Sequence, residues 1–152
     1  MIKSSKKPAK ETIGWYEHVQ LPELGLTACP AKVDTGARTS ALHADKIERF
    51  ERNGEGWVRF SVRFKSDKVV LNTQCEARLV DKRMVSNSGG HKQQRYVITT
   101  MAQLGQHTWP IEITLTHRGT MKFPMLLGRT ALSTRFLVDV SRSNLLGKLS
   151  GS

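Results

Sequence analysis

The chain has 152 residues, with 24 lysines and arginines against 13 aspartates and glutamates, which gives a formal charge of +11. This length favours one domain with a real hydrophobic core and leaves too little chain for two ordinary domains. The charge favours anionic partners such as RNA, acidic peptides or a membrane surface, without choosing among them.

The first ten residues are basic and almost free of apolar side chains, because they include Lys3, Lys6, Lys7 and Lys10. Such a composition predicts a disordered tail, which we place over residues 1–12. Without these four charges the rest of the chain still carries 11 − 4 = +7, so the folded part is itself basic. We expect one domain over residues 13–149 and a flexible C-terminus over residues 150–152.

Apolar and polar residues alternate through much of the chain, as is typical of half-buried β-strands. The alternation is clearest in residues 58–64, where valine and phenylalanine occupy every second position. In chain order, strands are predicted over residues 14–19, 28–33, 41–50, 58–64, 69–73, 76–85, 95–101, 111–115, 123–127 and 136–140. One short helix is predicted near the C-terminus, over residues 130–134. The pattern indicates an all-β barrel or sandwich.

Turn-forming residues separate several of these strands. Asn53-Gly54 is a strong signal for a two-residue hairpin, and Leu104-Gly105-Gln106 predicts a second turn. Residues 86–90 form a longer, glycine-containing tip. The hairpin over residues 82–98 is therefore our best candidate for a flap that covers a bound substrate.

The cysteines and the hydropathy bear on the cellular compartment. Cys29 and Cys75 are far apart and lie in strand-like contexts, which indicates free thiols in a reducing compartment. No apolar run approaches the roughly 20 residues of a membrane-spanning helix, and the N-terminal stretch does not resemble a signal peptide. We expect a cytoplasmic protein without a membrane partner.

Asp34-Thr35-Gly36-Ala37 is the most informative stretch, and it directly follows the strand-like run Ala31-Lys32-Val33. A carboxylate at a strand end, beside a small hydroxyl residue and a glycine, suits a group that must meet a second carboxylate closely. A second signal, Leu126-Leu127-Gly128-Arg129, lies far downstream. Together they indicate an aspartic peptidase. The alternative interpretation is an ordinary turn in which Asp34 is a local cap.

The chain resembles a bacterial retropepsin-like family often labelled as ATP-dependent zinc proteases, which includes RimB, the companion of a ligase that adds glutamates to a ribosomal protein. The resemblance extends from Gly14 to Lys148, and it is carried by four segments: Asp34-Thr35-Gly36-Ala37, Thr39-Ser40-Ala41-Leu42-His43-Ala44, residues 125–129 and residues 136–139. It implies a closed acid-protease barrel with one Asp-Thr-Gly per subunit. It also implies an active site that is completed by a second copy in a homodimer.

The catalytic residues that this resemblance implies are Asp34, Thr35 and Gly36. Asp139 is not followed by threonine and glycine, so the second carboxylate would be Asp34 of another copy. Two carboxylates at close range share one proton. The ionised one would activate water, and the protonated one would polarise the scissile carbonyl.

Arg38 follows the Asp34 motif and carries a guanidinium that can bind a carboxylate in two-pronged fashion, which favours acidic substrates. Lys92 and Arg118 could extend the positive field. The full set of predicted substrate-binding residues is Ala37, Arg38, His43, Ser88, Gly89, Arg95 and Arg129. For Arg129, the alternative is a brace of the Leu126-Leu127-Gly128 turn.

The residues support no metal or ATP site. The sequence has no His-Glu-x-x-His motif, and its histidines (His18, His43, His91, His107 and His117) are at least ten residues apart. A phosphate-binding Gly-x-x-x-x-Gly-Lys-Ser/Thr loop does not occur either. We therefore predict no metal and no cofactor.

The leading hypothesis is an aspartic endopeptidase that acts on acidic peptide tails and trims glutamates from a glutamylated ribosomal protein. Its partners would be that substrate, a second copy of the chain, and a glutamate ligase or ribosomal protein. One alternative is a catalytically silent acidic-peptide-binding domain, which would tolerate asparagine at position 34. Another is a basic β-barrel associated with RNA or the ribosome, whose affinity would fall steeply with salt. Against it, none of Trp15, Trp57 and Trp109 is expected in a basic-aromatic cluster.

Overall fold

The computed structural model describes residues 9–66, 68–86, 89–117 and 123–147. In chain order its elements are β1 (Glu11–Ile13), β2 (Tyr16–Leu21), the 3-10 helix η1 (Pro22–Leu24), β3 (Leu26–Asp34), β4 (Ser40–His43), β5 (Asp45–Arg52), β6 (Glu55–Ser66), β7 (Val69–Ser86), β8 (Lys92–Leu104), β9 (His107–Thr116), β10 (Met125–Gly128), α1 (Arg129–Leu132) and β11 (Phe136–Val138). The prediction of an all-β chain with one short α-helix near the C-terminus is confirmed for these residues.

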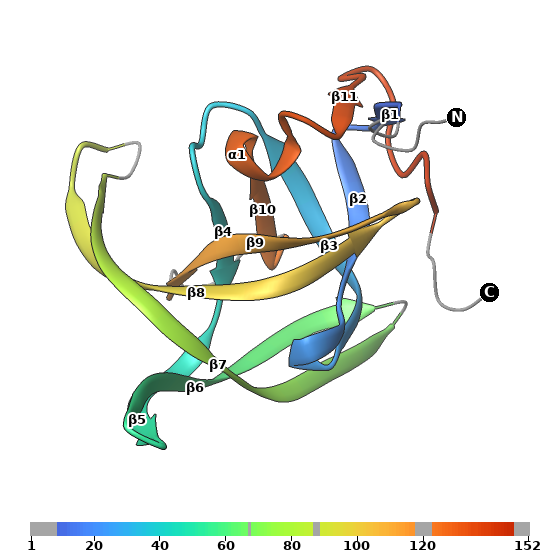
Figure 1. Ribbon diagram of the computed structural model, residues 1–152. Coiled ribbons are helices and arrows are strands. Elements are labelled where there is room, and N and C mark those ends of the chain that lie inside the picture. Colours follow the sequence, from blue (N-terminus) through green and yellow to red (C-terminus); the bar gives the residue numbers. More distant parts are fainter. Residues whose placement is uncertain (1–8, 67, 87–88, 118–122, 148–152) are drawn as a thin grey trace, which may run out of the picture.

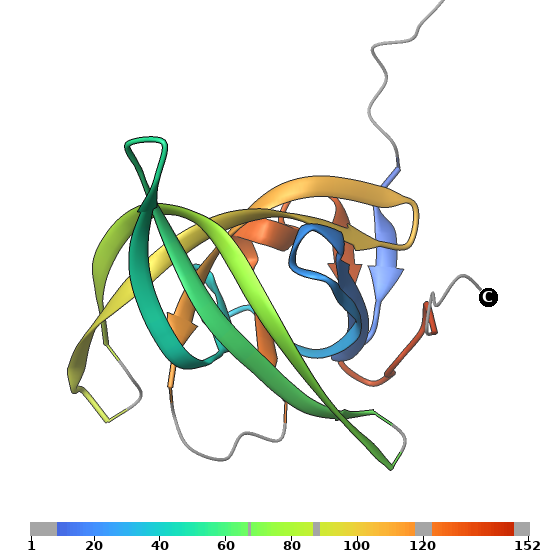
Figure 2. The same cartoon turned by 90° about the horizontal axis from the view of Figure 1, so that it is seen from below.

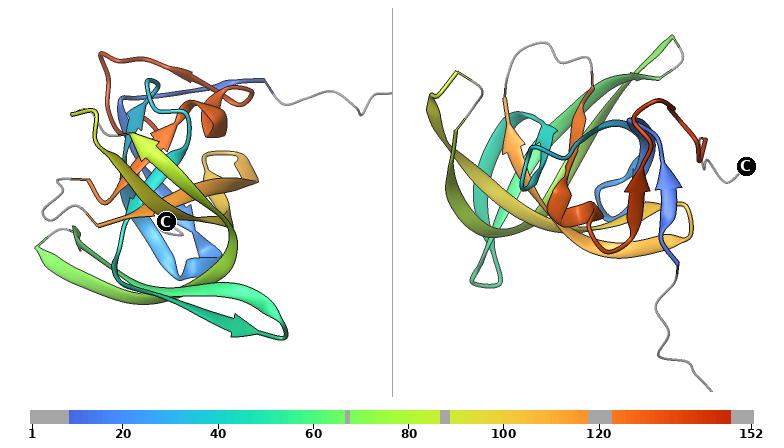
Figure 3. Two further views of the ribbon diagram at one scale, coloured as in Figure 1. Left: turned by 90° about the vertical axis from the view of Figure 1, so that its left-hand side faces the viewer. Right: turned by 90° about the horizontal axis from the view of Figure 1, so that it is seen from above.

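Within the described chain, nine strands follow one another in the order β2-β3-β10-β4-β9-β8-β7-β6-β5 (Figure 1). Strand β2 also pairs with β8, where Gln20 lies opposite Gln103. The first strand of this order is therefore also paired with the sixth. Strands β1 and β11 form a separate parallel pair, seen side by side in the right-hand view of Figure 3.

The hydrophobic core is built from the alternation that the sequence predicted. On β6, Val58, Phe60 and Val62 are fully buried, while Arg59 and Arg63 on the opposite face are exposed. On β9, the inward positions Ile111, Ile113 and Leu115 are buried in the same way. Each buried side chain of this size contributes about 1.5–3 kcal/mol of transfer free energy, so this alternation fixes the face of each strand.

The predicted Asn53-Gly54 turn joins β5 to β6 and projects from the molecule in Figure 2. Arg52 pairs with Glu55 across it. The φ angles of Asn53 and Gly54 are +53° and +77°, the left-handed values that the tight hairpin turn of this kind requires.

Two strand predictions differ from the structure. The strand predicted over residues 41–50 is divided at Ala44, because β4 pairs with β9 and β10 whereas β5 pairs with β6. Conversely, the strands predicted over residues 69–73 and 76–85 are one continuous strand, β7. Its first part, up to Arg78, pairs with β6, and its second part, from Leu79, pairs with β8.

The chain ends also differ from the prediction. Glu11 and Thr12 were placed in the predicted tail, but they form part of β1, which is held by its pairing with β11. Residues 1–8 and 148–152 lie outside the described residues, so the remainder of the predicted tail and the predicted flexible C-terminus stay predictions. No helix in the described residues is long and apolar enough to cross a membrane.

A buried carboxylate ties the segment after β11 to the start of β2. Glu17 is fully buried, and its side chain accepts hydrogen bonds from the backbone N–H groups of Gly14 (2.8 Å), Leu145 (2.8 Å) and Leu146 (3.1 Å). His18 beside it lies 2.8 Å from the side-chain oxygen of Asn144. These contacts satisfy a charge that would be costly to bury alone.

Both cysteines are free, as the sequence predicted, and both are buried. Burial raises the pKa of Cys29 and of Cys75 to about 12, and for Cys29 the neighbouring Cys75 contributes a smaller part.

Candidate active site

The site forms where β10 lies between β3 and β4. Strand β10 runs parallel to β3, with Gly128 opposite Asp34, and antiparallel to β4, with Met125 opposite Leu42. Because β3 and β10 are parallel, their carboxyl ends meet at one edge of the sheet (Figure 1). The two motifs that the sequence analysis singled out are therefore direct neighbours.

Gly128 is buried against the start of β4, and no larger residue fits there. A Cβ atom at this position would lie 2.6 Å from the carbonyl carbon of Thr39 and 2.9 Å from the backbone nitrogen of Ser40. The N–H of Gly128 donates to Ser40 Oγ at 3.0 Å, and Ser40 is fully buried. The glycine thus allows the backbones of β10 and β4 to approach closely, and the hydroxyl of Ser40 accepts the hydrogen bond of the Gly128 N–H.

The loop after β3 presents the carboxylate of Asp34 in a defined orientation. The backbone N–H of Gly36 donates to Asp34 Oδ1 at 3.1 Å, and the N–H of Ala37 donates to the Asp34 carbonyl at 3.1 Å. Asp34 is half-buried, while Thr35 and Gly36 are exposed. The tip of this loop is therefore accessible to another molecule.

Helix α1 supports the loop from the side, as Figure 1 shows. The N–H of Arg129 donates to the Ala37 carbonyl at 2.9 Å, and both the N–H and the hydroxyl of Thr130 donate to the Arg38 carbonyl, at 3.1 and 2.8 Å. The guanidinium of Arg129 donates to the carbonyl of Gly36 at 3.2 Å. The same guanidinium also donates to the Thr35 carbonyl at 3.4 Å, so five hydrogen bonds fix the loop to the segment that follows β10.

A cleft of about 1260 Å³ opens beside this loop. It is bounded by the Asp34 loop, by β9 and by the outer part of the β7–β8 hairpin. Of the predicted site residues, the structure brings five to this cleft: Asp34, Gly36, Ala37, Arg38 and Arg95. The cleft is large enough for a peptide segment or a small-molecule ligand.

Other predicted site residues lie elsewhere. Among the residues that the structure describes, Thr35, His43, Gly89 and Arg129 are not part of the cleft lining. The side chain of Arg129 instead donates to carbonyls of the Asp34 loop, and not to the Leu126-Leu127-Gly128 turn that the alternative interpretation named. His43 points to Asp45 and His117. Ser88 and Arg118 lie outside the described residues.

Basic side chains dominate the charge of the cleft. Lys32, Arg38, Arg83 and Arg95 line it, against two acidic residues, Asp34 and Glu112. Glu112 accepts a 2.9 Å hydrogen bond from Arg83, which also binds Asp81 at 2.8 Å. These hydrogen bonds raise the pKa of Arg83, with the Asp81 contact as the larger cause. Asp34 is therefore the acidic residue that the loop contributes to the cleft, and most of the other charged residues in the lining are basic.

The predicted flap hairpin borders the cleft. Arg83, Met84, Val85 and Ser86 on β7 contribute to its wall, and Met84 is 60% exposed. Arg95 on β8 is buried, and its Nε donates to Gln93 Oε1 at 3.1 Å. Sequence reasoning missed Lys32, Arg83 and Glu112, because each occupies an ordinary polar position in an alternating strand.

The expectation that no tryptophan lies in a basic-aromatic cluster was wrong for Trp57. Trp57 does lie in a basic-aromatic cluster, since the guanidinium of Arg52 is 4.5 Å from its ring centroid and that of Arg59 is 4.4 Å from the ring of Phe50. Both arginines are also hydrogen-bonded to Glu76, at 2.6 and 3.1 Å. These bonds lower the pKa of Glu76, and the carboxylate offsets part of the positive charge of the cluster.

A family model and a solved structure each match most of the chain. A family model described as "RimB-like: Retropepsin-like aspartic endopeptidase RimB" matches residues 12–148. A crystal structure from Legionella pneumophila, titled as a protein with unknown function, superimposes with a TM-score of 0.76 at 28% identity, covering 91% of this chain and 99% of that one.

Curated relatives are longer proteins. The chain is 45% identical over 141 residues to a protein of Shewanella halifaxensis named "Probable alpha-L-glutamate ligase", covering 91% of this chain and 30% of the relative. A protein of the same name from Desulfotalea psychrophila is 42% identical over 147 residues, with 96% and 32% covered. The chain therefore spans about a third of the length of these relatives.

Proposed function

Because the chain belongs to the RimB-like family of retropepsin-like aspartic endopeptidases, we propose that it is a peptidase whose catalytic carboxylate is Asp34. The observation that carries the proposal is the position of Asp34, half-buried at the edge of a large cleft and oriented by the N–H of Gly36. The return of β2 onto β8 supports the closed acid-protease barrel that such an enzyme needs.

The reaction requires a second carboxylate, and we assign it to Asp34 of another copy. Glu112, the other acidic residue in the cleft lining, is engaged by Arg83. Asp139 accepts hydrogen bonds from the hydroxyl and N–H of Ser141 and does not line the cleft in the described structure. The exposed tip at Thr35 and Gly36 leaves room for the matching loop of a second copy.

In the proposed dimer the two carboxylates share one proton, because like charges at close range disfavour double ionisation. The ionised carboxylate takes a proton from water, and the resulting nucleophile attacks the scissile carbonyl. The protonated carboxylate donates its hydrogen bond to the carbonyl oxygen as negative charge develops there. Thr35 and Gly36 would position the paired loops.

We propose acidic peptide tails, and specifically glutamate tails, as the substrate. Four basic residues line the cleft against two acidic ones, which favours an anionic peptide. The similarity to part of proteins named as glutamate ligases supports a link with glutamate chemistry. An enzyme that trims glutamates from a modified ribosomal protein would reverse the addition that a ligase makes.

The test is cleavage of a peptide with a poly-glutamate tail by the wild type and by Asp34→Asn. Asparagine can still accept the N–H of Gly36, so folding should be retained, while activity should fall at least about a hundredfold. A matched peptide with glutamines in place of glutamates separates charge recognition from general proteolysis. Light scattering on the same samples measures the oligomeric state. Equal behaviour of the two proteins, or full activity of a monomer, would contradict the proposed dyad.

A further inference from the structure

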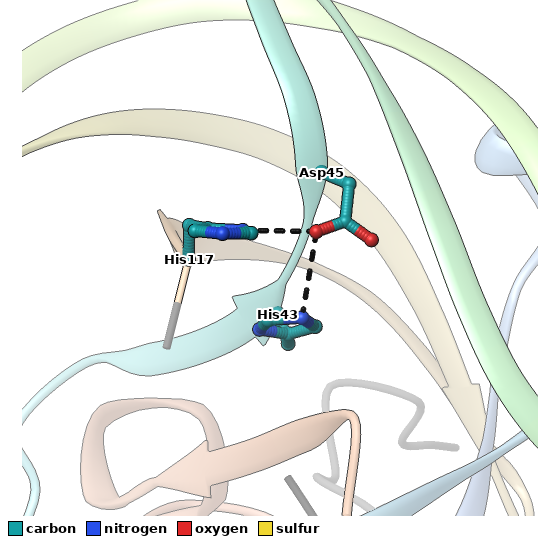
Figure 4. A group of neighbouring side chains, drawn as sticks. All are labelled: His43, Asp45 and His117. Atoms are coloured by element: carbon teal, nitrogen blue, oxygen red, sulfur yellow. Dashed lines mark ion pairs between the residues drawn. The ribbon is translucent and has the colours of Figure 1, made fainter. Parts of the chain in front are cut away.

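Away from the cleft, three side chains that can bind a metal ion converge at another edge of the sheet: His43, Asp45 and His117 (Figure 4). One potential ligand atom from each lies within 4.8 Å of those from the other two. In the described structure none of the three lines the cleft beside Asp34. Their chemistry is therefore separate from the proposed peptidase reaction.

The backbone explains why residues 74 positions apart meet here. Strands β4 and β9 are parallel, with His43 opposite Thr116, so His117 follows at the same edge at which β4 ends. The N–H of Ala44 donates to the Thr116 carbonyl at 2.9 Å, and the N–H of His43 donates to the Pro124 carbonyl at 2.7 Å. The positions of the two histidines are thus fixed by main-chain hydrogen bonds.

The three side chains point to a common centre. Asp45 Oδ1 is 2.9 Å from His117 Nδ1 and 3.7 Å from His43 Nε2, and the two imidazole rings are stacked with centroids 5.5 Å apart. Each of these nitrogens either carries a proton that it donates to the Asp45 carboxylate or presents a lone pair. With lone pairs presented, a metal ion can lie between the three ligand atoms.

The spacing fits a metal ion. Ligand atoms at about 2.0–2.1 Å from a tetrahedral zinc are roughly 3.3 Å from one another. The distances from Asp45 Oδ1 to the two imidazole nitrogens, 2.9 and 3.7 Å, lie on either side of this value. Two imidazoles and one carboxylate suit zinc and related transition ions, whereas magnesium prefers oxygen ligands alone.

The site is also accessible. The side chain of His43 is 12% exposed, that of Asp45 36% and that of His117 64%, so an ion can enter from the His117 side. Three protein ligands leave a fourth position for water, as in open zinc sites.

We propose that His43, Asp45 and His117 form a binding site for a divalent transition metal ion of the zinc class, which ties together the ends of β4 and β9 and the start of β5. The sequence analysis predicted no metal because it relied on ligands that are close together in the sequence. The parallel pairing of β4 and β9, which brings His43 near His117, cannot be read from the sequence. An ion that binds the folded chain stabilises it in proportion to its affinity and concentration.

Titration calorimetry of the untagged full chain with Zn²⁺ tests the site. We expect one ion per chain, with affinity reduced at least tenfold in both Asp45→Asn and His117→Ala. His91→Ala is the matched control, because it removes an exposed histidine outside the cluster and should bind like the wild type. Mg²⁺ at the same concentration should not bind.

A second measurement identifies the ligands. X-ray absorption of the zinc-loaded protein should show nitrogen and oxygen neighbours at about 2.0–2.1 Å and no sulfur. The thermal midpoint of the wild type should rise with Zn²⁺, while that of His117→Ala should not. The proposal is overturned if the wild type binds no zinc, if both cluster variants bind it normally, or if sulfur appears among the ligands. In the first case the contacts are only hydrogen bonds or ion pairs between the two histidines and Asp45.

Discussion

Gly128 lies opposite Asp34 in the parallel pair of β10 and β3, and its N–H is bound by Ser40 at the start of β4. One residue without a side chain thus connects the strand that carries the carboxylate to the strand that follows its loop. The geometry of the carboxylate depends on this contact.

Replacing Gly128 with alanine should destabilise the protein and disturb the Asp34 loop. The added Cβ would meet backbone atoms of Thr39 and Ser40 that cannot rotate away, and such overpacking typically costs about 1–3 kcal/mol. Urea denaturation measures the loss. Gly56→Ala is the control, since its Cβ would meet only side-chain atoms, the nearest being Arg49 Nη2 at 3.3 Å. Equal stability of the two variants would show that β10 tolerates a side chain here.

Replacing Glu17 with glutamine should loosen the segment after β11. The amide would turn a donor toward backbone N–H groups that now bind a carboxylate, and hydrogen bonds to charged groups contribute about 1.5–3 kcal/mol each. We expect a loss of at least one such bond in urea denaturation, with faster hydrogen exchange at Leu145 and Leu146. Glu48→Gln serves as comparison, because the Glu48 side chain is exposed and its ion pair with Arg59 lies at the surface. The prediction is wrong if both variants unfold at the same urea concentration.

Reversing the charge of Arg38 should change substrate preference without loss of stability. Its backbone carbonyl, not its side chain, holds the loop to Thr130, and the exposed side chain lines the cleft. For Arg38→Glu we expect kcat/KM on an acidic peptide to fall on the order of tenfold, which corresponds to about 1.4 kcal/mol. Arg63→Glu changes the net charge equally but lies on β6, outside the cleft lining. A similar loss in both variants would assign the effect to overall charge.

The two cysteines should be unreactive in the folded protein. A pKa of about 12 leaves very little thiolate at pH 8, so a thiol reagent should modify Cys29 and Cys75 only after unfolding. The raised pKa also means that folding favours the protonated thiols. Their stabilisation is present below the unfolded value of 9.0 and is lost as the pH rises from there toward 12. Rapid stoichiometric labelling of the native protein at pH 8 would contradict this.

Local patterns predicted much of the fold. Alternation placed β6 and its buried valines and phenylalanines correctly, and Asn53-Gly54 gave the hairpin before it. The division at Ala44 could not be predicted, because it results from a change of pairing partner rather than from local composition. The same holds for β7, whose change of partner at Leu79 leaves no break in the strand.

Apart from Arg95 on β8, the site was predicted only as far as its motifs reach. Asp34, Gly36, Ala37 and Arg38 are consecutive or nearly so, and the structure places them together at the cleft. Lys32, Arg83 and Glu112 come from three different strands, and only the sheet order brings them to the same place. The brace from Arg129 and the convergence of His43 with His117 depend on long-range pairing in the same way.

The insertion of β10 has a consequence for biosynthesis. Gly128 follows Ser40 by 88 residues, yet it fills the gap between two strands that are nearly adjacent in the chain. A nascent polypeptide that has left the ribosome only as far as β9 lacks the middle of this sheet and the brace of its acidic loop. Contacts of such long sequence separation form slowly. The cleft can therefore form only after β10 and α1 have been made, because before that point the Asp34 loop lacks the hydrogen bonds that support it.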